Sequence, residues 1–546
     1  MLGILIYAAL LNNANAVNTS PFRNPEKPYK QTSDDADNVL KYTGWQGPYS
    51  DRRGVGINRD TPATCRVDQV IQLTRHCERY PDQYDWVEQY GSLSKILDHQ
   101  GSLNGSLSFA NTYVPFATED LGWLGEESLY GPYSGLLDAF NQGVQARRRY
   151  YDLYDGDSIL PIFTSGYERV ADTARMFGKG FLNWNYTELA ALNIIPETLA
   201  QGANTLVPAC NNSDVASTTC SYPKNSTEAN SPWLYPEYNV AVARLNKENP
   251  GLNLNQSDIP HLIGMAAFEL NVRGSSPWVD VFTSEEWIAF EYAQSSLYYC
   301  FYGPPSPLAA PQGSIFMNAT RALLLDGPEN GLPLYFTFAH DTDIMQLLTA
   351  LGVIEDEEWN GNVVEFNHKF DVTDFTPQGA HVVFERLVCD EDISSDLWTE
   401  SELNSEYPAG AYNISQNLTA QYGSGDDYGF NSTTGEVIYP NNTNHTVGTE
   451  NIYVRIVLNE AVVPLNGCSD GPGYSCGLND FNDYVNSRMD NITSFVEICN
   501  ITSAPTYLDF FWNYNTSTAL DEMDKLGSME GYIGSDGQPI YVPPWW

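Results

Sequence analysis

The chain has 546 residues, of which 42% are hydrophobic and 13% aromatic, enough for one large or two medium domains with a packed core. It carries 69 acidic and 27 basic residues, for a formal net charge of −42 at pH 7. This charge argues against binding to nucleic acid or to an anionic membrane, because both require a basic surface. Solubility is the simplest interpretation of the acidity. Adaptation to acid is a second hypothesis, because carboxylates become neutral near pH ~3–5 and then stop repelling one another.

The first sixteen residues are typical of a secretory signal peptide. Residues 2–11 form a short apolar core, and Ala14-Asn15-Ala16 fits the small-x-small pattern before a cleavage site. We therefore expect a secreted, extracellular protein of the cell wall or periplasmic space. Fifteen Asn-x-Ser/Thr sequons predict N-linked glycans on this route. The sequons begin at Asn18, Asn104, Asn185, Asn211, Asn225, Asn255, Asn318, Asn413, Asn417, Asn431, Asn441, Asn444, Asn491, Asn500 and Asn515.

Residues 17–60 are rich in Pro, Asn, Gly and Tyr and have little periodicity, which predicts an extended N-terminal arm. Polar and apolar residues then alternate over 68–74, which predicts a strand that ends at the Arg-His-Cys-Glu-Arg sequence of residues 75–79. Apolar residues at helical spacing follow over 85–100 and again around 134–154.

A second strand is expected at 159–164, followed by a helix whose first turn contains Arg169. Residues 180–305 have mostly helical periodicity and predict an inserted α-helical cap. A third strand at 332–338 ends at the His340-Asp341 pair and is followed by an apolar helix.

Two more strands are expected at 380–388 and 451–458, on either side of a polar, sequon-rich segment over 400–450. Strands that alternate with helices indicate the α/β class. These elements divide the chain into a signal peptide (1–16), an arm (17–60), an α/β catalytic domain (61–179 and 306–505), a helical cap (180–305) and a C-terminal tail (506–546).

Residues suited to phosphate chemistry follow the first three strands in turn: Arg75, His76 and Arg79, then Arg169, then His340 and Asp341. Ligands of open α/β sheets bind where the carboxyl ends of the strands meet, so we expect these six residues to line one crevice. Guanidinium groups match phosphate oxygens bidentately, and histidine is a competent covalent nucleophile. Neighbouring arginines also disfavour imidazolium, which keeps His76 neutral below its ordinary pKa of ~6.5.

This set predicts phosphoryl transfer that requires no metal ion and no cofactor. We expect His76 to attack phosphorus while the arginines and His340 neutralise charge on the phosphate oxygens. Asp341 can protonate the leaving oxygen and then activate water, and Asp343 is a weaker candidate for the same role.

The nine cysteines have no metal-site spacing, which in a secreted chain predicts structural disulfides. An odd count leaves one cysteine unpaired, and Cys77 is our candidate because it lies inside the proposed pocket.

The motifs resemble those of the histidine acid phosphatases, in branch 2 of the histidine phosphatase superfamily. Residues 75–81 match the family motif R-H-G-x-R-x-P except at position 77, and residues 339–341 match its His-Asp motif. Residues 165–170 are similar to its third-arginine segment. The lead-in over 45–65 resembles that of secreted yeast and fungal acid phosphatases and phytases.

The resemblance implies a phosphoglycerate-mutase-like sheet flanked by helices, with an inserted, mostly α-helical cap. It implies His76 as the nucleophile, Asp341 as the proton donor, and Arg75, Arg79, Arg169 and His340 as the phosphate ligands. It also implies disulfides Cys65–Cys389, Cys210–Cys499 and Cys468–Cys476, and leaves Cys220 and Cys300 as a further candidate pair.

We therefore expect a secreted acid phosphatase that hydrolyses small phosphate monoesters. The family has glycine where this chain has Cys77, and glycine often marks unusual backbone angles or close approach of a ligand. The alternative is a catalytically impaired relative that acts as a cell-wall or phosphate-ligand-binding glycoprotein. Phytate, nucleotides, thiamine phosphates and sugar phosphates all stay open as substrates, with broad monoester activity favoured. The oligomeric state is also open, and only analogy suggests a homo-oligomer.

Overall fold

A computed structural model describes residues 27–32, 35–118, 123–210, 212, 234–355, 357–360, 362–389, 429–431, 436–438 and 451–516. The predicted signal peptide, most of the polar segment over 400–450 and the tail beyond residue 516 lie outside the described residues. So do Cys220 and the sequons at Asn18, Asn211, Asn225, Asn413, Asn417, Asn441 and Asn444. In the part of the chain that the structure describes, no helix is long and apolar enough to cross a membrane.

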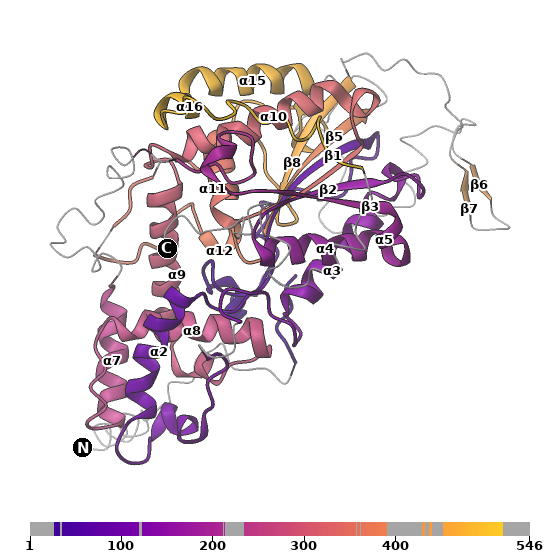
Figure 1. The fold of residues 1–546 in the computed structure, drawn as a ribbon. Helices are drawn as coiled ribbons and strands as arrows, with labels where there is room; N and C mark the ends of the chain where they lie inside the picture. The colour runs from indigo at the N-terminus through magenta and orange to yellow at the C-terminus, as the bar shows by residue number, and fades with distance from the viewer. Residues whose placement is uncertain are drawn as a thin grey trace, which may run out of the picture.

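A mixed β-sheet forms the centre of the α/β body, with the strand order β10-β8-β5-β1-β4-β2-β3 and β9 paired to β8 (Figure 1). Strands β1, β4, β2 and β3 are parallel, and β5, β8, β9 and β10 add antiparallel pairs on one side. The strands are β1 (Cys65–Arg75), β2 (Leu160–Ser165), β3 (Ala190–Ile195), β4 (Leu334–Ala339), β5 (His381–Cys389), β8 (Ile452–Leu458), β9 (Ala461–Val462) and β10 (Cys476–Gly477). The five strands expected from the sequence are all present, and the predicted α/β class is confirmed. Strands β6 (Gly429–Asn431) and β7 (Glu436–Ile438) form a separate hairpin.

The central strands are buried on both faces because helices cover both sides of the sheet. Every residue of β2 and β4 is buried, which explains their nearly continuous apolar sequence. Neighbouring residues of β1 pack into different cores: Val70 lies in the cluster that contains Phe177 and Phe181, and Ile71 lies in the larger cluster on the other face.

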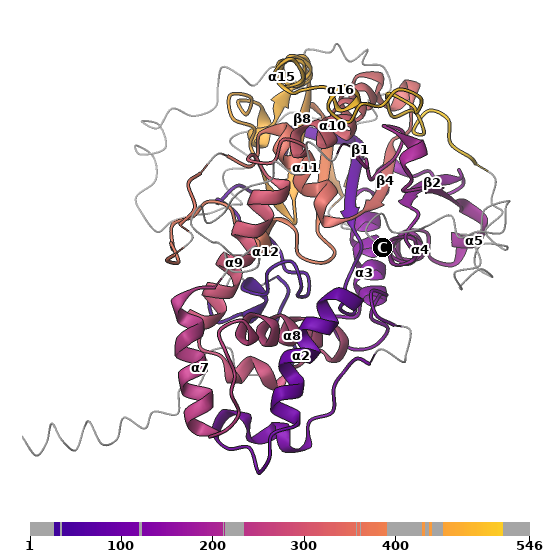
Figure 2. The same cartoon turned by 60° about the vertical axis from the view of Figure 1, so that its left-hand side comes forward.

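Helices α3 (Gly135–Arg149) and α4 (Glu168–Leu182) pack together on one face of the sheet (Figures 1 and 2). Helices α10 (Ala309–Asn330), α11 (Asp341–Leu351) and α15 (Leu478–Asn491) cover the other face. Short helices α5 (Tyr186–Leu189), α12 (Val372–Phe375) and α16 (Phe495–Ile498) complete the body. This layering matches the flanked sheet expected from the sequence.

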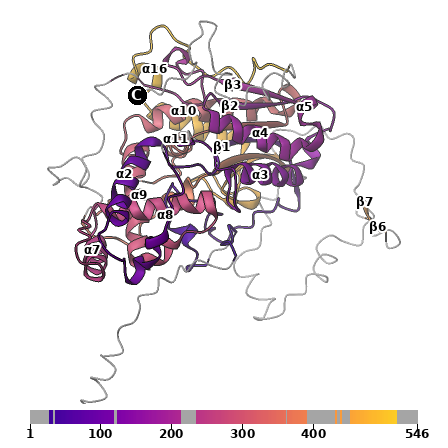
Figure 3. The ribbon, with the colours of Figure 1, turned by 60° about the horizontal axis from the view of Figure 1, so that its bottom comes forward.

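A second helical layer lies at one end of the body and contains α2 (Gln83–Leu97), α7 (Pro236–Glu248), α8 (Asp258–Arg273) and α9 (Ser284–Tyr302) (Figures 2 and 3). Helix α2 packs against α8, although it precedes the segment predicted as a cap. Conversely, residues 190–195 fall inside the predicted cap range of 180–305 but form β3, the edge strand beside β2. We propose that the cap is built from α2 and α7–α9 and that its inserted part begins after β3.

Disulfides tie the distant parts of the body together. Cys65–Cys389, Cys210–Cys499 and Cys468–Cys476 are all formed, as the family resemblance implied. Cys300 is also disulfide-bonded, but Cys220, its proposed partner, lies outside the described residues. Of the cysteines that the structure describes, Cys77 is unpaired, and it is buried.

Candidate active site

The register of the parallel strands brings the candidate residues to one edge of the sheet. Arg75, the last residue of β1, pairs with Ala339 of β4, and Thr164 of β2 pairs with Phe338. The residues that follow these strands therefore share the carboxyl edge of the sheet. The rings of His76 and His340 lie there with their centroids 5.9 Å apart, although 264 positions separate the two residues in the sequence.

The imidazole of His76 is held in one orientation. Its Nδ1 lies 2.8 Å from the carbonyl oxygen of Cys77. Because a carbonyl only accepts hydrogen bonds, Nδ1 carries the proton, and Nε2 of the neutral ring keeps a free lone pair. Burial, reinforced by Arg169, Arg75 and Arg79, lowers the pKa of His76 well below its ordinary value. The side chain is thus a neutral imidazole in a cationic environment.

Arg75 is completely buried and is fixed by backbone oxygens. Its Nη1 donates to the carbonyls of Trp45 at 2.8 Å and Thr376 at 2.6 Å. Its Nη2 lies 3.0 Å from Oδ2 of Asp341. The predicted N-terminal arm therefore contributes to the site, because Trp45 belongs to it.

Arg79 and Arg169 approach from the loop after β1 and from the first turn of α4. Nη1 of Arg79 donates to the carbonyl of Tyr80 at 2.9 Å, and the guanidinium of Arg169 lies 3.8 Å from the centroid of the Tyr167 ring.

The arginines carry hydrogen-bond donors that no protein group satisfies. Among the described residues, the Nε atoms of Arg75, Arg79 and Arg169 are buried and have no hydrogen-bond partner. A buried unsatisfied donor costs about 1–3 kcal/mol, more when charged. An oxyanion beside His76 would offer acceptors to such donors, so the arrangement favours an anionic ligand.

Asp341 is the first residue of α11. Its Oδ2 accepts a hydrogen bond from the Tyr298 hydroxyl at 2.8 Å and faces Arg75, and its Oδ1 accepts from the backbone N–H of Thr342 at 2.9 Å. Burial by itself raises the pKa of Asp341, but Arg75 and the Tyr298 hydrogen bond outweigh burial and lower it overall. The ionised form of Asp341 is therefore favoured.

The weaker candidate acid, Asp343, has a structural contact instead. Its Oδ2 accepts from the backbone N–H of His340 at 3.0 Å, which caps the start of α11. Burial raises the pKa of Asp343 well above its ordinary value.

The backbone at Cys77 does not require glycine. Only a positive φ would favour glycine there, and Cys77 is not among the described residues with positive φ. Its N–H donates to Oγ1 of Thr173 at 3.0 Å and to Oε1 of Glu127 at 3.2 Å. Its Sγ lies beside Gly379, where an added Cβ would be 3.4 Å from the sulfur. Burial raises the pKa of the Cys77 thiol well above its ordinary value, so the sulfur is a neutral packing group.

Sequence reasoning missed Glu197. Its Oε1 lies 3.0 Å from Nε2 of His340, and both side chains are largely buried. Glu197 follows the carboxyl end of β3. The other candidate site residues were predicted because they follow the carboxyl ends of strands in the same way. It was missed because β3 was not recognised as a strand.

The fold and the site together define an α/β protein with a buried histidine in an arginine-lined pocket at the carboxyl edge of its sheet. The family model of the histidine phosphatase superfamily (branch 2) matches residues 66–402. The chain belongs to this superfamily, as its motifs indicated.

The relatives are similar over nearly their whole length. A phytase of Candida albicans is 32% identical over 518 residues, which cover 93% of this chain and 97% of the relative. An acid phosphatase of Komagataella pastoris is 31% identical over 501 residues, 89% of this chain and 92% of the relative. The crystal structure of the D. castellii phytase superimposes with a TM-score of 0.70 at 30% identity, covering 89% of this chain and 93% of that one.

Proposed function

We propose that the protein is an acid phosphatase that hydrolyses phosphate monoesters through a covalent phosphohistidine on His76. The observation that carries the proposal is a neutral, oriented imidazole among three arginines whose buried Nε atoms lack partners. The names of the relatives, phytase and acid phosphatase, support small phosphorylated substrates.

In the first step, Arg75, Arg79, Arg169 and His340 bind the phosphate oxygens and neutralise their charge. Nε2 of His76 forms a bond to phosphorus, the bond from phosphorus to the leaving oxygen breaks, and that oxygen takes a proton from Asp341. Asp341 must first gain this proton, because its lowered pKa favours the ionised form. The negative charge of the bound phosphate favours proton uptake by competing with Asp341 for Arg75, so we expect an optimum in acid.

In the second step, water attacks the phosphohistidine. Asp341 accepts the proton of the water, the P–N bond breaks, and inorganic phosphate leaves with His76 regenerated. The same carboxyl group thus donates a proton in one step and accepts one in the other.

Secretion to the cell wall or periplasmic space is part of the proposal. It is supported by the signal-like residues 1–16, by the sequons and by the disulfides. The impaired-relative alternative is disfavoured, because Cys77 fits beside Gly379 without positive φ.

Turnover of para-nitrophenyl phosphate between pH 3 and 6 tests the proposal. Wild type should release nitrophenol, and His76→Ala should lose at least about three orders of magnitude in kcat. Acid-quenched wild type should retain phosphate on a peptide containing residue 76. A wild type without activity, combined with an active Cys77→Gly variant, would instead support the impaired relative.

A further inference from the structure

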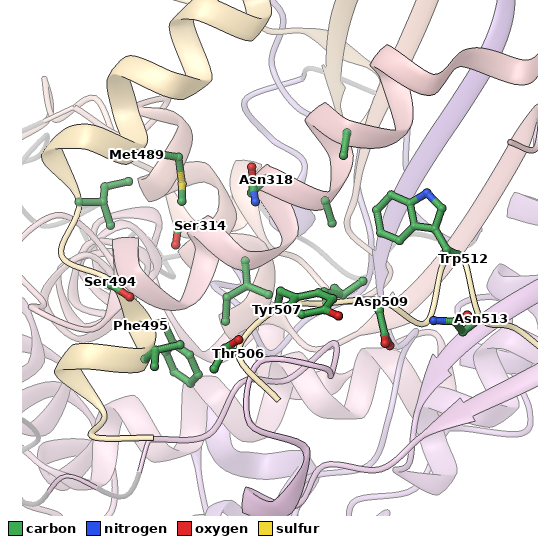
Figure 4. Close-up of a pocket in the computed structure, with 16 residues that line it drawn as sticks. Ser314, Asn318, Met489, Ser494, Phe495, Thr506, Tyr507, Asp509, Trp512 and Asn513 are labelled. Atoms are coloured by element: carbon green, nitrogen blue, oxygen red, sulfur yellow. The ribbon is translucent and has the colours of Figure 1, made fainter. Parts of the chain in front are cut away.

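A groove lies outside the candidate active site (Figure 4). Its volume of about 640 Å³ is within the range of about 300–1,000 Å³ that is typical of small-molecule sites. Its walls are α10, the end of α15, residues 492–496 with the start of α16, and residues from the stretch 506–513. Two aromatic side chains, Tyr507 and Trp512, line it while 66% and 41% exposed. The indole Nε1 of Trp512 donates to Oδ2 of Asp326 at 3.0 Å, which fixes the ring.

One of the predicted glycosylation sequons forms part of the groove wall. Asn318-Ala319-Thr320 lies within α10, and Asn318 lines the groove. Its Oδ1 accepts from Nε and Nη2 of Arg321 at 3.2 and 2.9 Å. These bonds identify the other amide atom as Nδ2, and Figure 4 shows it on the side of the group that faces Tyr507.

Thr320 supplies a second, independent observation. It is completely buried, and its hydroxyl has no hydrogen-bond partner among the described residues. A buried hydroxyl without a partner destabilises the fold, and a β-branched residue is a weak helix former. Packing therefore gives no reason for a hydroxyl at this position, whereas a sequon requires one.

We propose that an N-glycan attached to Asn318 occupies this groove and that its first sugar residues pack against Trp512 and Tyr507. Attachment forms a bond between Nδ2 and C1 of the first sugar. It breaks the bond from C1 to the pyrophosphate of a lipid-linked oligosaccharide, and Nδ2 loses one proton. Because Thr320 is buried in the folded chain, this reaction precedes folding of α10.

The glycan and the groove are chemically complementary. The C–H faces of a pyranose ring pack on aromatic rings, and its hydroxyls find acceptors and donors on Asp509, Asn513 and Ser314. The exposed sequons at Asn104 and Asn255 lack these surroundings, because neither asparagine lines the groove.

The test uses full-length protein secreted from a yeast host and treated with endoglycosidase H without denaturation. Peptide mass spectrometry follows the release of each glycan separately. We expect Asn318 to be occupied, and its glycan to be released about tenfold more slowly than those on Asn104 and Asn255, because release requires local opening of the groove. Trp512→Ala should bring the rate at Asn318 to that of the exposed sites, and Tyr507→Ala serves if Trp512→Ala is not secreted.

Trp184→Ala is the matched control, because Trp184 is 90% exposed beside the sequon at Asn185 and does not line the groove. It should leave release at Asn318 unchanged. Asn318→Gln should leave phosphatase turnover unchanged, which separates this proposal from that of the function. An unmodified Asn318 in the secreted protein would overturn the proposal and leave the groove to another occupant, such as the chain beyond residue 516. Release as fast as at Asn104 would overturn it equally.

Discussion

Nε2 of His340 lies 3.0 Å from Oε1 of Glu197, across 143 positions of sequence. Burial alone raises the pKa of Glu197, but His340 and Arg169 outweigh burial and lower it overall. The contact with Glu197 fixes the ring of His340 at the carboxyl edge of the sheet. In the proposed mechanism His340 binds a phosphate oxygen, which makes Glu197 a positioning residue.

Glu197→Gln should therefore weaken substrate binding more than it slows chemistry. The amide still reaches Nε2 of His340 but removes the negative charge that holds the ring in place. We expect KM to rise about fivefold, with kcat changed by less than a factor of two. Glu188→Gln, an exposed change on α5, is the matched control. A fall in kcat with KM unchanged would contradict this role for Glu197.

Asp341→Asn and Asp343→Asn separate the proton donor from the helix cap. Asp341→Asn should lower kcat by about 10²- to 10⁴-fold on an alkyl phosphate, whose leaving oxygen needs a proton, and less on para-nitrophenyl phosphate. Asp343→Asn keeps an oxygen for the N–H of His340 and should retain most of the activity. Kinetics with both substrates at pH 4.5 give the comparison, and similar losses in the two variants would remove Asp341 from its proposed role.

Cys77→Gly should restore the family motif with little effect on turnover. The thiol packs beside Gly379, so its removal leaves a small cavity and a more flexible loop. We expect kcat/KM within about threefold of wild type and a loss of about 1–2 kcal/mol in the free energy of unfolding. Urea titration and steady-state kinetics on the same preparation measure the two quantities. A large gain in activity would mean that Cys77 obstructs the phosphate after all.

The fold should be more stable in mild acid than at neutral pH. Burial is the leading cause that raises the pKa of five carboxyl groups to about 6 or 7: Asp51, Asp85, Glu126, Asp138 and Asp374. Between these values and the unfolded values of ~4, the folded state binds more protons than the unfolded state. The free energy of unfolding therefore increases as the pH falls from about 7 to about 4.5.

His76 and His261 oppose this trend. Burial lowers the pKa of both histidines, so the unfolded chain binds more protons at these positions below its ordinary pKa of ~6.5, and the free energy of unfolding falls. Carboxyl groups with a lowered pKa stabilise the fold while they are ionised. Their contribution to the free energy of unfolding, as for Glu460 with a pKa of about 2, begins to fall only below pH ~4.5. Urea midpoints at pH 7, 6, 5 and 4.5 check the balance, and Asp138→Asn should flatten the rise. A midpoint that falls steadily from pH 7 would contradict it.

Treatment with a chelator should leave turnover unchanged. In the proposed mechanism the positive charge around the phosphate comes from Arg75, Arg79 and Arg169. Assays with and without EDTA at pH 4.5, using wild type and Arg169→Lys, make the comparison. Arg169→Lys keeps the charge but loses the bidentate fork, so KM should rise about tenfold in both conditions. Recovery of lost activity by added divalent metal would contradict the expectation.

Local features of this fold follow from the amino-acid sequence. The alternation in β1 and the apolar runs of β2 and β4 predicted three strands, because side-chain periodicity reflects which faces are buried. Since parallel strands share a carboxyl edge, the same pattern predicted that His76 and His340 would meet.

Contacts between segments far apart in the sequence became visible in the folded chain alone. Residues 190–195 carry no clear alternation, so β3 became recognisable only through its pairing with β2, and Glu197 only through its contact with His340. Likewise, the space that accepts Cys77 exists because Gly379, 302 positions later, leaves room beside it. Local patterns encode the burial of each segment, whereas the identity of its neighbours depends on strand order and packing, which form only when the whole chain folds.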